Sequence, residues 1–190
     1  MAFLTQDQAR AASTFRGQKV LAEAEIRKSA AASAAATFDV FLSHSKEDAE
    51  IIAGVKRLLE AGGLTVYVDW IDDSQLDRSR VTTATAAQLR KRMRQCKSLI
   101  FATSKSSSDS KWMPWELGYF DGFKPGHVAV LPLVSTPGAA FVGQEYLGLY
   151  PRVQDIGGAG RGPNLGFVAN TPPQEFPVES LVSSEFTLSA

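Results

Sequence analysis

The segment from Lys111 to Phe120, K-W-M-P-W-E-L-G-Y-F, places a carboxylate, Glu116, among four aromatic rings. A charged group on an apolar face costs free energy unless it is paired or hydrogen-bonded. If the segment is helical, one face carries Trp112, Trp115, Glu116, Tyr119 and Phe120. A carboxylate beside aromatic rings suits the recognition of a flat, positively charged ring. The alternative is that the rings are ordinary core and Glu116 turns toward water.

The start of this helix can be located from one residue. Pro114 is tolerated only near the first turn of a helix, where backbone N–H groups have no intrahelical partner. We therefore expect the helix to begin close to Trp112. Glu116 would then lie near the helix N-terminus, where the helix dipole favours a negative charge.

Other combinations of reactive residues are poorer. The chain has two histidines, His44 and His127, and one cysteine, Cys96, which argues against a zinc site of Cys and His. Ser43 adjoins His44, but no G-x-S-x-G pattern exposes a nucleophilic serine, and no G-x-x-x-x-G-K-[ST] pattern predicts a phosphate loop. We expect His44 to be a strand-end residue held by hydrogen bonds.

The elements that must position these residues alternate between strand and helix. Apolar runs predict strands at F-D-V-F-L-S-H-S, L-T-V-Y-V-D-W, S-L-I-F-A-T-S and H-V-A-V-L-P-L-V, with helices after the first three. This alternation predicts an α/β protein with a parallel sheet and helices on both faces. Ligands bind such sheets beyond the carboxyl ends of the strands. We therefore expect Ser43, His44, Asp69 and Trp70 on the same rim as Glu116.

The bulk composition fits one cytoplasmic domain. The chain has 190 residues, of which 44% are hydrophobic and 21% charged. No apolar run approaches the roughly 20 residues of a membrane-spanning helix, and the N-terminus lacks the features of a secretion signal. The single cysteine fits a reducing compartment. Lys+Arg and Asp+Glu both number 20, so no net field attracts nucleic acid, and we expect neither nucleic acid nor a membrane as a partner.

Charge is nevertheless uneven along the chain. One loop holds Asp69, Asp72, Asp73 and Asp77, and the basic segment 90–97 contains no acidic residue. A charge run is usually a solvated helix face. The alternative is self-association, with the 69–80 loop of one copy against the basic 90–97 helix of the next. In that case, charge reversal at Arg90 and Arg92 should lower activity without unfolding the domain.

The two ends of the chain differ from its centre. Residues 1–36 are rich in Ala, Gln, Arg, Lys and Glu, with no proline, and predict an N-terminal helical arm. The main domain is expected over residues 37–165. Prolines at positions 172, 173 and 177 predict an extended C-terminal tail over residues 166–190.

Four segments together resemble one known family. F-D-V-F-L-S-H-S-K-E-D, T-V-Y-V-D-W with its long loop, S-L-I-F-A-T-S and W-M-P-W-E-L-G, in this order, resemble a Toll/interleukin-receptor (TIR) domain over roughly residues 37–150. The resemblance implies a flavodoxin-like fold with a central parallel sheet of about five strands. Some TIR domains are scaffolds that self-associate through the loop after the second strand, here residues 69–80. Others cleave NAD+ with a glutamate in a W-x-x-x-E pattern, which falls here on Trp112 and Glu116.

The matching glutamate favours the enzyme, and the chain resembles NAD+-cleaving TIR proteins of anti-phage systems such as Thoeris. Breaking the nicotinamide–ribose bond produces an oxocarbenium-like centre, and we expect Glu116 to stabilise its positive charge. The products implied are nicotinamide and either ADP-ribose or a cyclic isomer that acts as a signal. NAD+ is then a substrate, with no cofactor and no metal, and a separate effector protein is expected to sense the product.

Five further residues are expected to contact or enclose NAD+. Trp112 would stack on the nicotinamide or form a wall of the pocket. Ser43 and His44 would meet ribose or phosphate, and Asp69 and Trp70 would help to form a loop that closes the site.

Two other functions stay open at this point. The first is a non-catalytic interaction module, either a scaffold or a mimic of host TIR domains, which would keep full biological activity with Glu116→Gln. The second is an enzyme like the nucleoside deoxyribosyltransferases, which would turn over deoxynucleosides and not NAD+.

Overall fold

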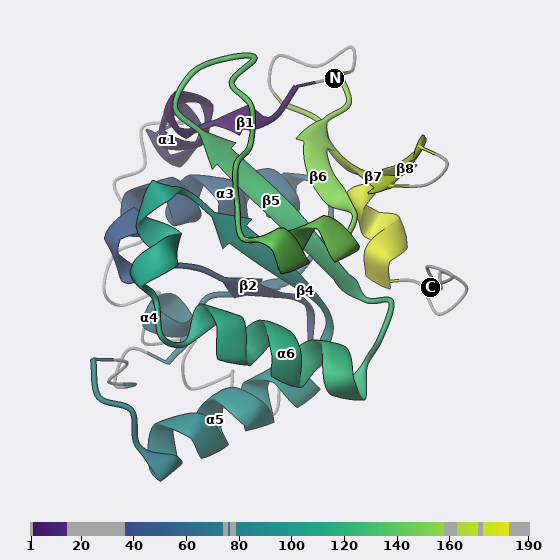
Figure 1. The fold of residues 1–190 in the computed structure, drawn as a ribbon. Helices are drawn as coiled ribbons and strands as arrows, with labels where there is room; N and C mark the ends of the chain where they lie inside the picture. Colours follow the sequence, from purple (N-terminus) through teal and green to yellow (C-terminus); the bar gives the residue numbers. More distant parts are fainter. Residues whose placement is uncertain are drawn as a thin grey trace.

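A computed structural model describes residues 2–14, 37–73, 76, 79–157, 163–170 and 173–182 of the chain. Within these ranges, eight strands form one sheet: β1 (Leu4–Thr5), β2 (Phe38–Ser43), β3 (Val66–Tyr67), β4 (Cys96–Thr103), β5 (Val128–Val134), β6 (Arg152–Asp155), β7 (Leu165–Asn170) and β8 (Pro173–Pro177). The order across the sheet is β3-β2-β4-β5-β6-β7-β8, and β1 pairs with β5 (Figure 1).

The centre of the sheet is parallel. Strands β3, β2, β4, β5 and β6 pair in parallel in that order. Within this group the first strand of the chain lies between the second and the third, which is the strand order of flavodoxin-like folds. The predicted α/β fold with a central parallel sheet of about five strands is therefore confirmed. The winding reverses between β2 and β4, and ligands of such folds bind beside that point.

Strands β7 and β8 extend the sheet beyond β6 in antiparallel fashion. The sequence predicts only an extended tail from residue 166. The structure shows that part of this tail is paired into the sheet. Pro173 and Pro177 begin and end β8, the edge strand, where a missing backbone N–H interrupts no central ladder. The 3-10 helix η5 (Val178–Val182) follows, and residues 183–190 of the predicted tail lie outside the described residues.

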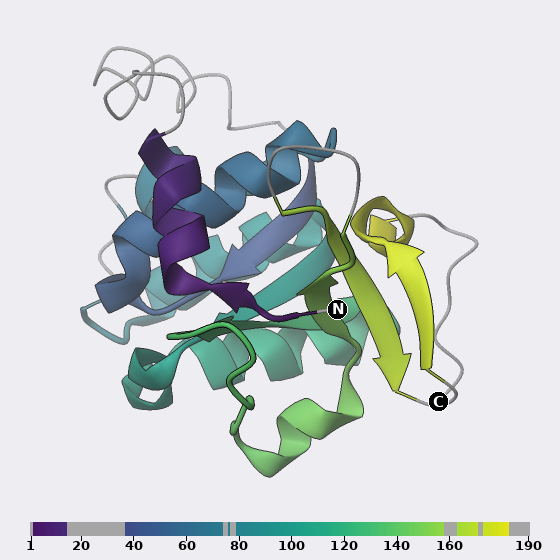
Figure 2. The same ribbon diagram turned by 90° about the horizontal axis from the view of Figure 1, so that it is seen from above.

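Helices cover both faces of the sheet (Figures 1 and 2). One face carries α1 (Gln6–Thr14) and α3 (Ala49–Ala61), and the other carries α5 (Thr83–Arg94) and α6 (Met113–Phe123). Shorter elements join them: α4 (Asp69–Asp72) and the 3-10 helices η2 (Lys46–Asp48), η3 (Lys105–Asp109) and η4 (Glu145–Leu149). In the described part of the chain, no helix combines the length and apolar character that a membrane crossing requires.

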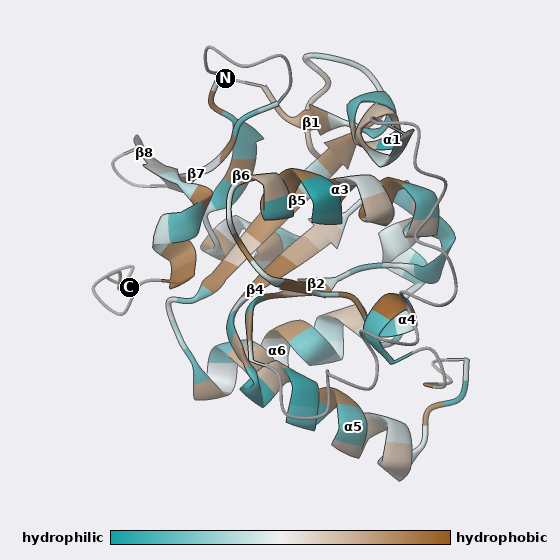
Figure 3. Cartoon of the chain, turned by 180° about the vertical axis from the view of Figure 1, so that it is seen from behind, coloured by the Kyte–Doolittle hydropathy of each residue, from teal (hydrophilic) through white to brown (hydrophobic). Residues whose placement is uncertain are grey.

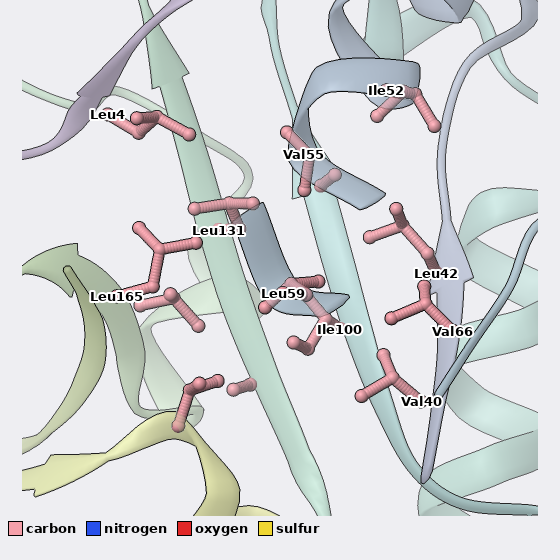
Figure 4. Packing of buried hydrophobic residues seen from close by; sticks show 14 of the residues in the cluster. Leu4, Val40, Leu42, Ile52, Val55, Leu59, Val66, Ile100, Leu131 and Leu165 are labelled. Atoms are coloured by element: carbon pink, nitrogen blue, oxygen red, sulfur yellow. The ribbon is translucent and has the colours of Figure 1, made fainter. Parts of the chain in front are cut away.

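The buried hydrophobic residues form one cluster on each face of the sheet. The cluster beneath α1 and α3 has only aliphatic side chains at its fully buried positions, among them Val40, Leu42, Ile52, Ile100 and Leu131 (Figure 4). The cluster beneath α5 and α6 contains the rings of Phe41, Tyr67, Phe101, Trp112 and Phe120. Neighbouring strand residues point to opposite faces, so one strand supplies both clusters. In Figure 3 the central strands are coloured mainly as hydrophobic, whereas the helices around them mix hydrophobic and hydrophilic residues.

The N-terminal segment packs against α3. Gly54 permits this close contact, because a Cβ atom at that position would lie 1.7 Å from the backbone oxygen of Ala9. Arg57 donates a hydrogen bond to the carbonyl oxygen of Ser13, near the end of α1. The arm predicted over residues 1–36 is thus helical at Gln6–Thr14, and residues 15–36 lie outside the described residues.

Candidate active site

A pocket of about 380 Å³ opens beyond the carboxyl ends of the central strands. Its lining comes from residues 44–47 after β2, from the segment that begins with Asp69 and Trp70 after β3, and from residues 109–112 before α6. The structure therefore brings His44, Asp69, Trp70 and Trp112 around one cavity. This cavity lies beside the switch point of the sheet, where ligands of such folds bind.

Glu116 lies behind the wall of this pocket. It is 0% exposed and belongs to the first turn of α6. The Ser43 hydroxyl donates a hydrogen bond to Glu116 Oε2 at 2.7 Å. Among the described residues, the lining includes their neighbours His44 and Trp112 but neither Ser43 nor Glu116. The alternative in which Glu116 turns toward water is therefore wrong.

Helix α6 begins where Pro114 requires, with Trp112 as the residue before its first turn. Its buried face consists of Met113, Glu116, Leu117 and Phe120. Trp115 and Tyr119 are half-buried at the edge of this face, not within it as predicted. Their rings stack with centroids 5.7 Å apart, and the Arg90 guanidinium lies over both rings, at 5.2 and 5.8 Å.

His44 links the end of β2 to the start of α4. Its Nδ1 atom is 2.8 Å from the Leu42 carbonyl oxygen, and because a carbonyl only accepts, Nδ1 carries a proton. Its Nε2 atom lies 3.4 Å from Asp69 Oδ1, and both side chains are nearly buried. His44 is thus held at the strand end by hydrogen bonding, as expected. This approach brings two segments that flank the pocket close together.

Four charged residues that the sequence analysis did not single out also line the pocket: Lys46, Glu47, Asp109 and Lys111. Ammonium groups donate hydrogen bonds to phosphate oxygens, and carboxylates accept them from hydroxyl groups. The available signal was their position, since these residues follow the predicted strands that end at the rim. In the described part of the chain, no group of three or more His, Cys, Asp or Glu side chains could hold a metal ion.

The acidic loop and the basic helix meet within one chain. Arg92 donates from Nε to Asp73 Oδ2 and from Nη2 to Asp73 Oδ1, both at 2.6 Å, and Tyr67 and Gln88 also donate to Asp73. Asp73 is 4% exposed and Arg92 is 3% exposed. The premise that Arg92 is available to a second copy is therefore wrong. Arg90 is exposed, and the prediction of self-association through this helix stays open for it.

The electrostatics of this pair follow from its hydrogen bonds. Burial alone would raise the pKa of the Asp73 carboxyl, but the donors Arg92, Tyr67 and Gln88 hold that pKa below its usual range. The hydrogen bond to Asp73 in turn raises the pKa of Arg92. Burial, together with the charge of Asp73, raises the pKa of Tyr67 far above its usual value. The pair is therefore ionised at neutral pH, and it ties the loop after β3 to α5.

The family model described as a TIR domain matches residues 40–150. The chain belongs to the TIR domain family. The matched region runs from β2 to the end of η4, so the TIR domain contains the pocket, Ser43 and Glu116.

Two curated relatives share part of this TIR domain protein. A protein of Bacillus cereus (strain MSX-D12) named "Probable 3′ cyclic ADP-D-ribose synthase ThsB′" is 58% identical over 117 residues, which are 61% of this chain and 60% of that protein. A protein of Cytobacillus dafuensis named "Putative cyclic ADP-D-ribose synthase TIR2" is 35% identical over 83 residues, which are 43% of this chain and 22% of that protein. The chain therefore spans less than two thirds of the length of either relative.

Proposed function

We propose that this TIR domain protein cleaves NAD+ at the nicotinamide–ribose bond and releases nicotinamide together with a cyclic ADP-ribose. The observation that carries the proposal is the buried carboxylate of Glu116, held by Ser43 behind a pocket at the switch point of the sheet. The names of the two relatives support the same chemistry and point to the cyclic product.

The chemistry needs a negative charge more than it needs an acid. When the glycosidic bond breaks, its electron pair leaves with nicotinamide, whose ring becomes neutral without taking up a proton. The positive charge stays on the ribose, and a carboxylate beside the ring stabilises it. Attack by water gives ADP-ribose, whereas attack by an atom of the same dinucleotide gives a cyclic product. A pocket that excludes water favours the second outcome.

The pocket residues suggest how the substrate would lie. A volume of about 380 Å³ falls within the range of ligand pockets, roughly 300 to 1,000 Å³. Trp112 offers a ring against which the nicotinamide can stack, and Lys46 and Lys111 offer ammonium groups for the diphosphate. Because Glu116 is fully buried, substrate binding must displace Trp112 or the segment before it to bring the ribose against the carboxylate.

The biological role that we propose is a signal in anti-phage defence. On this proposal the cyclic product acts on a separate effector protein in the cytoplasm, and NAD+ is consumed as a substrate. Self-association through the 69–80 loop and the exposed part of the 90–97 helix is part of the same proposal, as are the limits of the TIR domain at residues 37–165.

The test is to incubate the purified full chain with NAD+ and follow nicotinamide release, comparing wild type with Glu116→Gln. Glu145→Gln is a matched control, because it makes the same chemical change at an exposed carboxylate in η4. We expect release to fall roughly 10²- to 10³-fold in Glu116→Gln and to be unchanged in the control. Chromatography and mass spectrometry of the second product separate hydrolysis from cyclisation.

Two results would contradict the proposal. Equal rates in wild type and Glu116→Gln would remove the role of the carboxylate. No release from the wild type, even at high concentration and with extract of infected cells, would favour the interaction module instead.

A further inference from the structure

The position of Ser43 differs from the expectation that its side chain contacts the substrate. Its side chain is fully buried, and the pocket wall nearest to it is formed by the next residue, His44. Its hydroxyl has one proton, which it donates to Glu116 Oε2. While that hydrogen bond exists, Ser43 cannot donate to a substrate.

The direction of the Ser43 side chain is fixed by the sheet. Ser43 is the last residue of β2 and follows Phe41 by two positions, so both side chains point toward the face that carries α6. In the parallel register with β4, Ser43 is paired with Phe101. The backbone of Ser43 is therefore held by the pairing of β2 with β4, and its hydroxyl is a rigid hydrogen-bond donor for a carboxylate on a neighbouring helix.

A buried carboxylate depends on such a donor. Burial in an apolar layer disfavours the charged form, whereas a hydrogen bond donated to the charged form favours it. The surroundings of Glu116 on α6 are apolar, since Met113, Leu117 and Phe120 share its buried face. A neutral Glu116 could not stabilise a positively charged ribose.

We propose that Ser43 is a positioning residue, whose hydroxyl keeps the Glu116 carboxylate ionised and fixes its orientation for the reaction. This inference rests on the proposed function, because it takes Glu116 as the reacting carboxylate. It replaces the expectation that Ser43 binds ribose or phosphate.

The kinetic test compares Ser43→Ala and Ser43→Thr with the wild type by nicotinamide release across a range of pH. Ser43→Ala should lower kcat roughly 10- to 100-fold and leave KM within about twofold, because the lost contact is to Glu116 and not to NAD+. The acidic limb of its kcat profile should move to higher pH, and Ser43→Thr, which retains the hydroxyl, should restore most of the rate. The titratable groups that line the pocket are unchanged in these variants: His44, Lys46, Glu47, Asp69, Asp109 and Lys111.

A matched control is available on β4. Ser98 is also fully buried, and its hydroxyl donates to the Asp39 carbonyl oxygen at 2.9 Å, away from the pocket. Ser98→Ala should change the free energy of unfolding by an amount similar to Ser43→Ala and leave the kcat profile unchanged. The inference is overturned if Ser43→Ala raises KM at constant kcat, as substrate binding predicts. It is also overturned if Ser43→Ala, like Ser98→Ala, leaves the kcat profile unchanged.

A second measurement does not depend on turnover. In protein with ¹³C-labelled glutamate side chains, the resonance that disappears in Glu116→Gln belongs to Glu116, and its chemical shift reports protonation. We expect the titration of this resonance to move to higher pH in Ser43→Ala. An unchanged titration would overturn the inference even if the wild type cleaves NAD+. A moved titration in a protein without NAD+ cleavage would place the failure in the proposed function.

Discussion

The two faces of the sheet bury different kinds of side chains. The buried hydrophobic cluster beneath α1 and α3 is aliphatic, whereas the cluster beneath α5 and α6 includes aromatic rings and adjoins three buried charged groups, Glu116, Asp73 and Arg92. The two faces share their strands, since Phe41 and Leu42 are neighbours that point in opposite directions. The face that carries α5 and α6 therefore holds Glu116, the carboxylate on which the proposed chemistry depends.

Two buried carboxylates on the aromatic face, Asp73 and Glu116, are held in different ways. Asp73 receives a guanidinium group through two hydrogen bonds, and these lock it into an ion pair. Glu116 receives the neutral hydroxyl of Ser43, which orients the carboxylate without cancelling its charge. A carboxylate whose charge is already neutralised by an arginine of the same chain stabilises a positively charged ribose only weakly. This difference supports a structural role for Asp73 and agrees with the chemical role that we propose for Glu116.

Replacing each buried carboxylate by its amide should separate these roles with the largest effect. Asp73→Asn removes the carboxylate that accepts two hydrogen bonds from the buried Arg92, and it should lower the free energy of unfolding by about 3 to 5 kcal/mol. Glu116→Gln should change that free energy by less than about 1 kcal/mol, because it removes a buried charge while keeping an acceptor for Ser43. Urea unfolding followed by circular dichroism measures both values.

The control for this pair is Asp7→Asn, which alters an exposed ion pair with Arg10 and should cost less than about 1 kcal/mol. If Glu116→Gln destabilised the protein as much as Asp73→Asn, Glu116 would be structural and the comparison would fail. A loss below about 1 kcal/mol in Asp73→Asn would instead show that α5 does not depend on the ion pair.

Two helical glycines test whether the aliphatic face tolerates change as well as the aromatic face does. A Cβ atom at Gly54 on α3 would meet the backbone of α1, so Gly54→Ala should cost about 1 to 3 kcal/mol and expose the N-terminal segment to proteases. On α6, Gly118 is exposed, and a Cβ atom there would meet no atom of the described residues within 4 Å. Gly118→Ala should stabilise the protein by about 0.5 to 1 kcal/mol.

Thermal and urea unfolding, with limited proteolysis of the N-terminal segment, distinguish the two glycine variants. If Gly54→Ala and Gly118→Ala changed the free energy of unfolding equally, the contact between Gly54 and the backbone of α1 would not stabilise the packing of α1 on α3. Faster cleavage of the N-terminal segment in Gly118→Ala would also contradict the assignment of the contact to the α1 and α3 face.

The parallel strands and the start of α6 could be predicted from the sequence because their signals are local. Apolar runs of strand length mark β2, β4 and β5, and Pro114 fixes the beginning of the helix that carries Glu116. The bond from Ser43 to Glu116 joins residues 73 positions apart, and no local pattern encodes it. Strands β7 and β8 were missed because the prolines at positions 172, 173 and 177 favour an irregular segment, and only the pairing of the two strands makes them part of a sheet.

The error over Arg92 was avoidable. Arg92 and Arg90 are two positions apart on α5 and so lie on nearly opposite sides of the helix. Leu89 and Met93 are buried on the same side as Arg92, which places that arginine in the apolar stripe. The helical period could therefore have assigned Arg92 to an internal partner. The partner itself, Asp73, is 19 positions away in the loop after β3, and only the structure supplies it.

Substitution of Arg90 is expected to change the free energy of unfolding least, because Arg90, unlike the buried Arg92, is exposed. Its guanidinium lies over the half-buried rings of Trp115 and Tyr119, and a cation–π contact at such an exposed site is worth about 0.5 to 1 kcal/mol. Arg90→Ala should therefore lower the free energy of unfolding by no more than about 1 kcal/mol, as measured by urea unfolding. A larger loss would mean that the aromatic edge of α6 supports the fold as the Asp73–Arg92 pair does.

The same arginine decides whether the basic helix has a role outside the chain. If copies associate through the exposed part of this helix, Arg90→Glu should reduce nicotinamide release most strongly at low enzyme concentration, where dissociation is favoured. Charge reversal at exposed Lys105 in η3 is the control, since it changes the net charge by the same amount outside this helix. Because Arg90 contributes so little to the fold, a loss of activity on dilution would be separable from unfolding. Equal activity of Arg90→Glu and wild type at every concentration would confine the function of α5 to the buried side, where Arg92 holds Asp73.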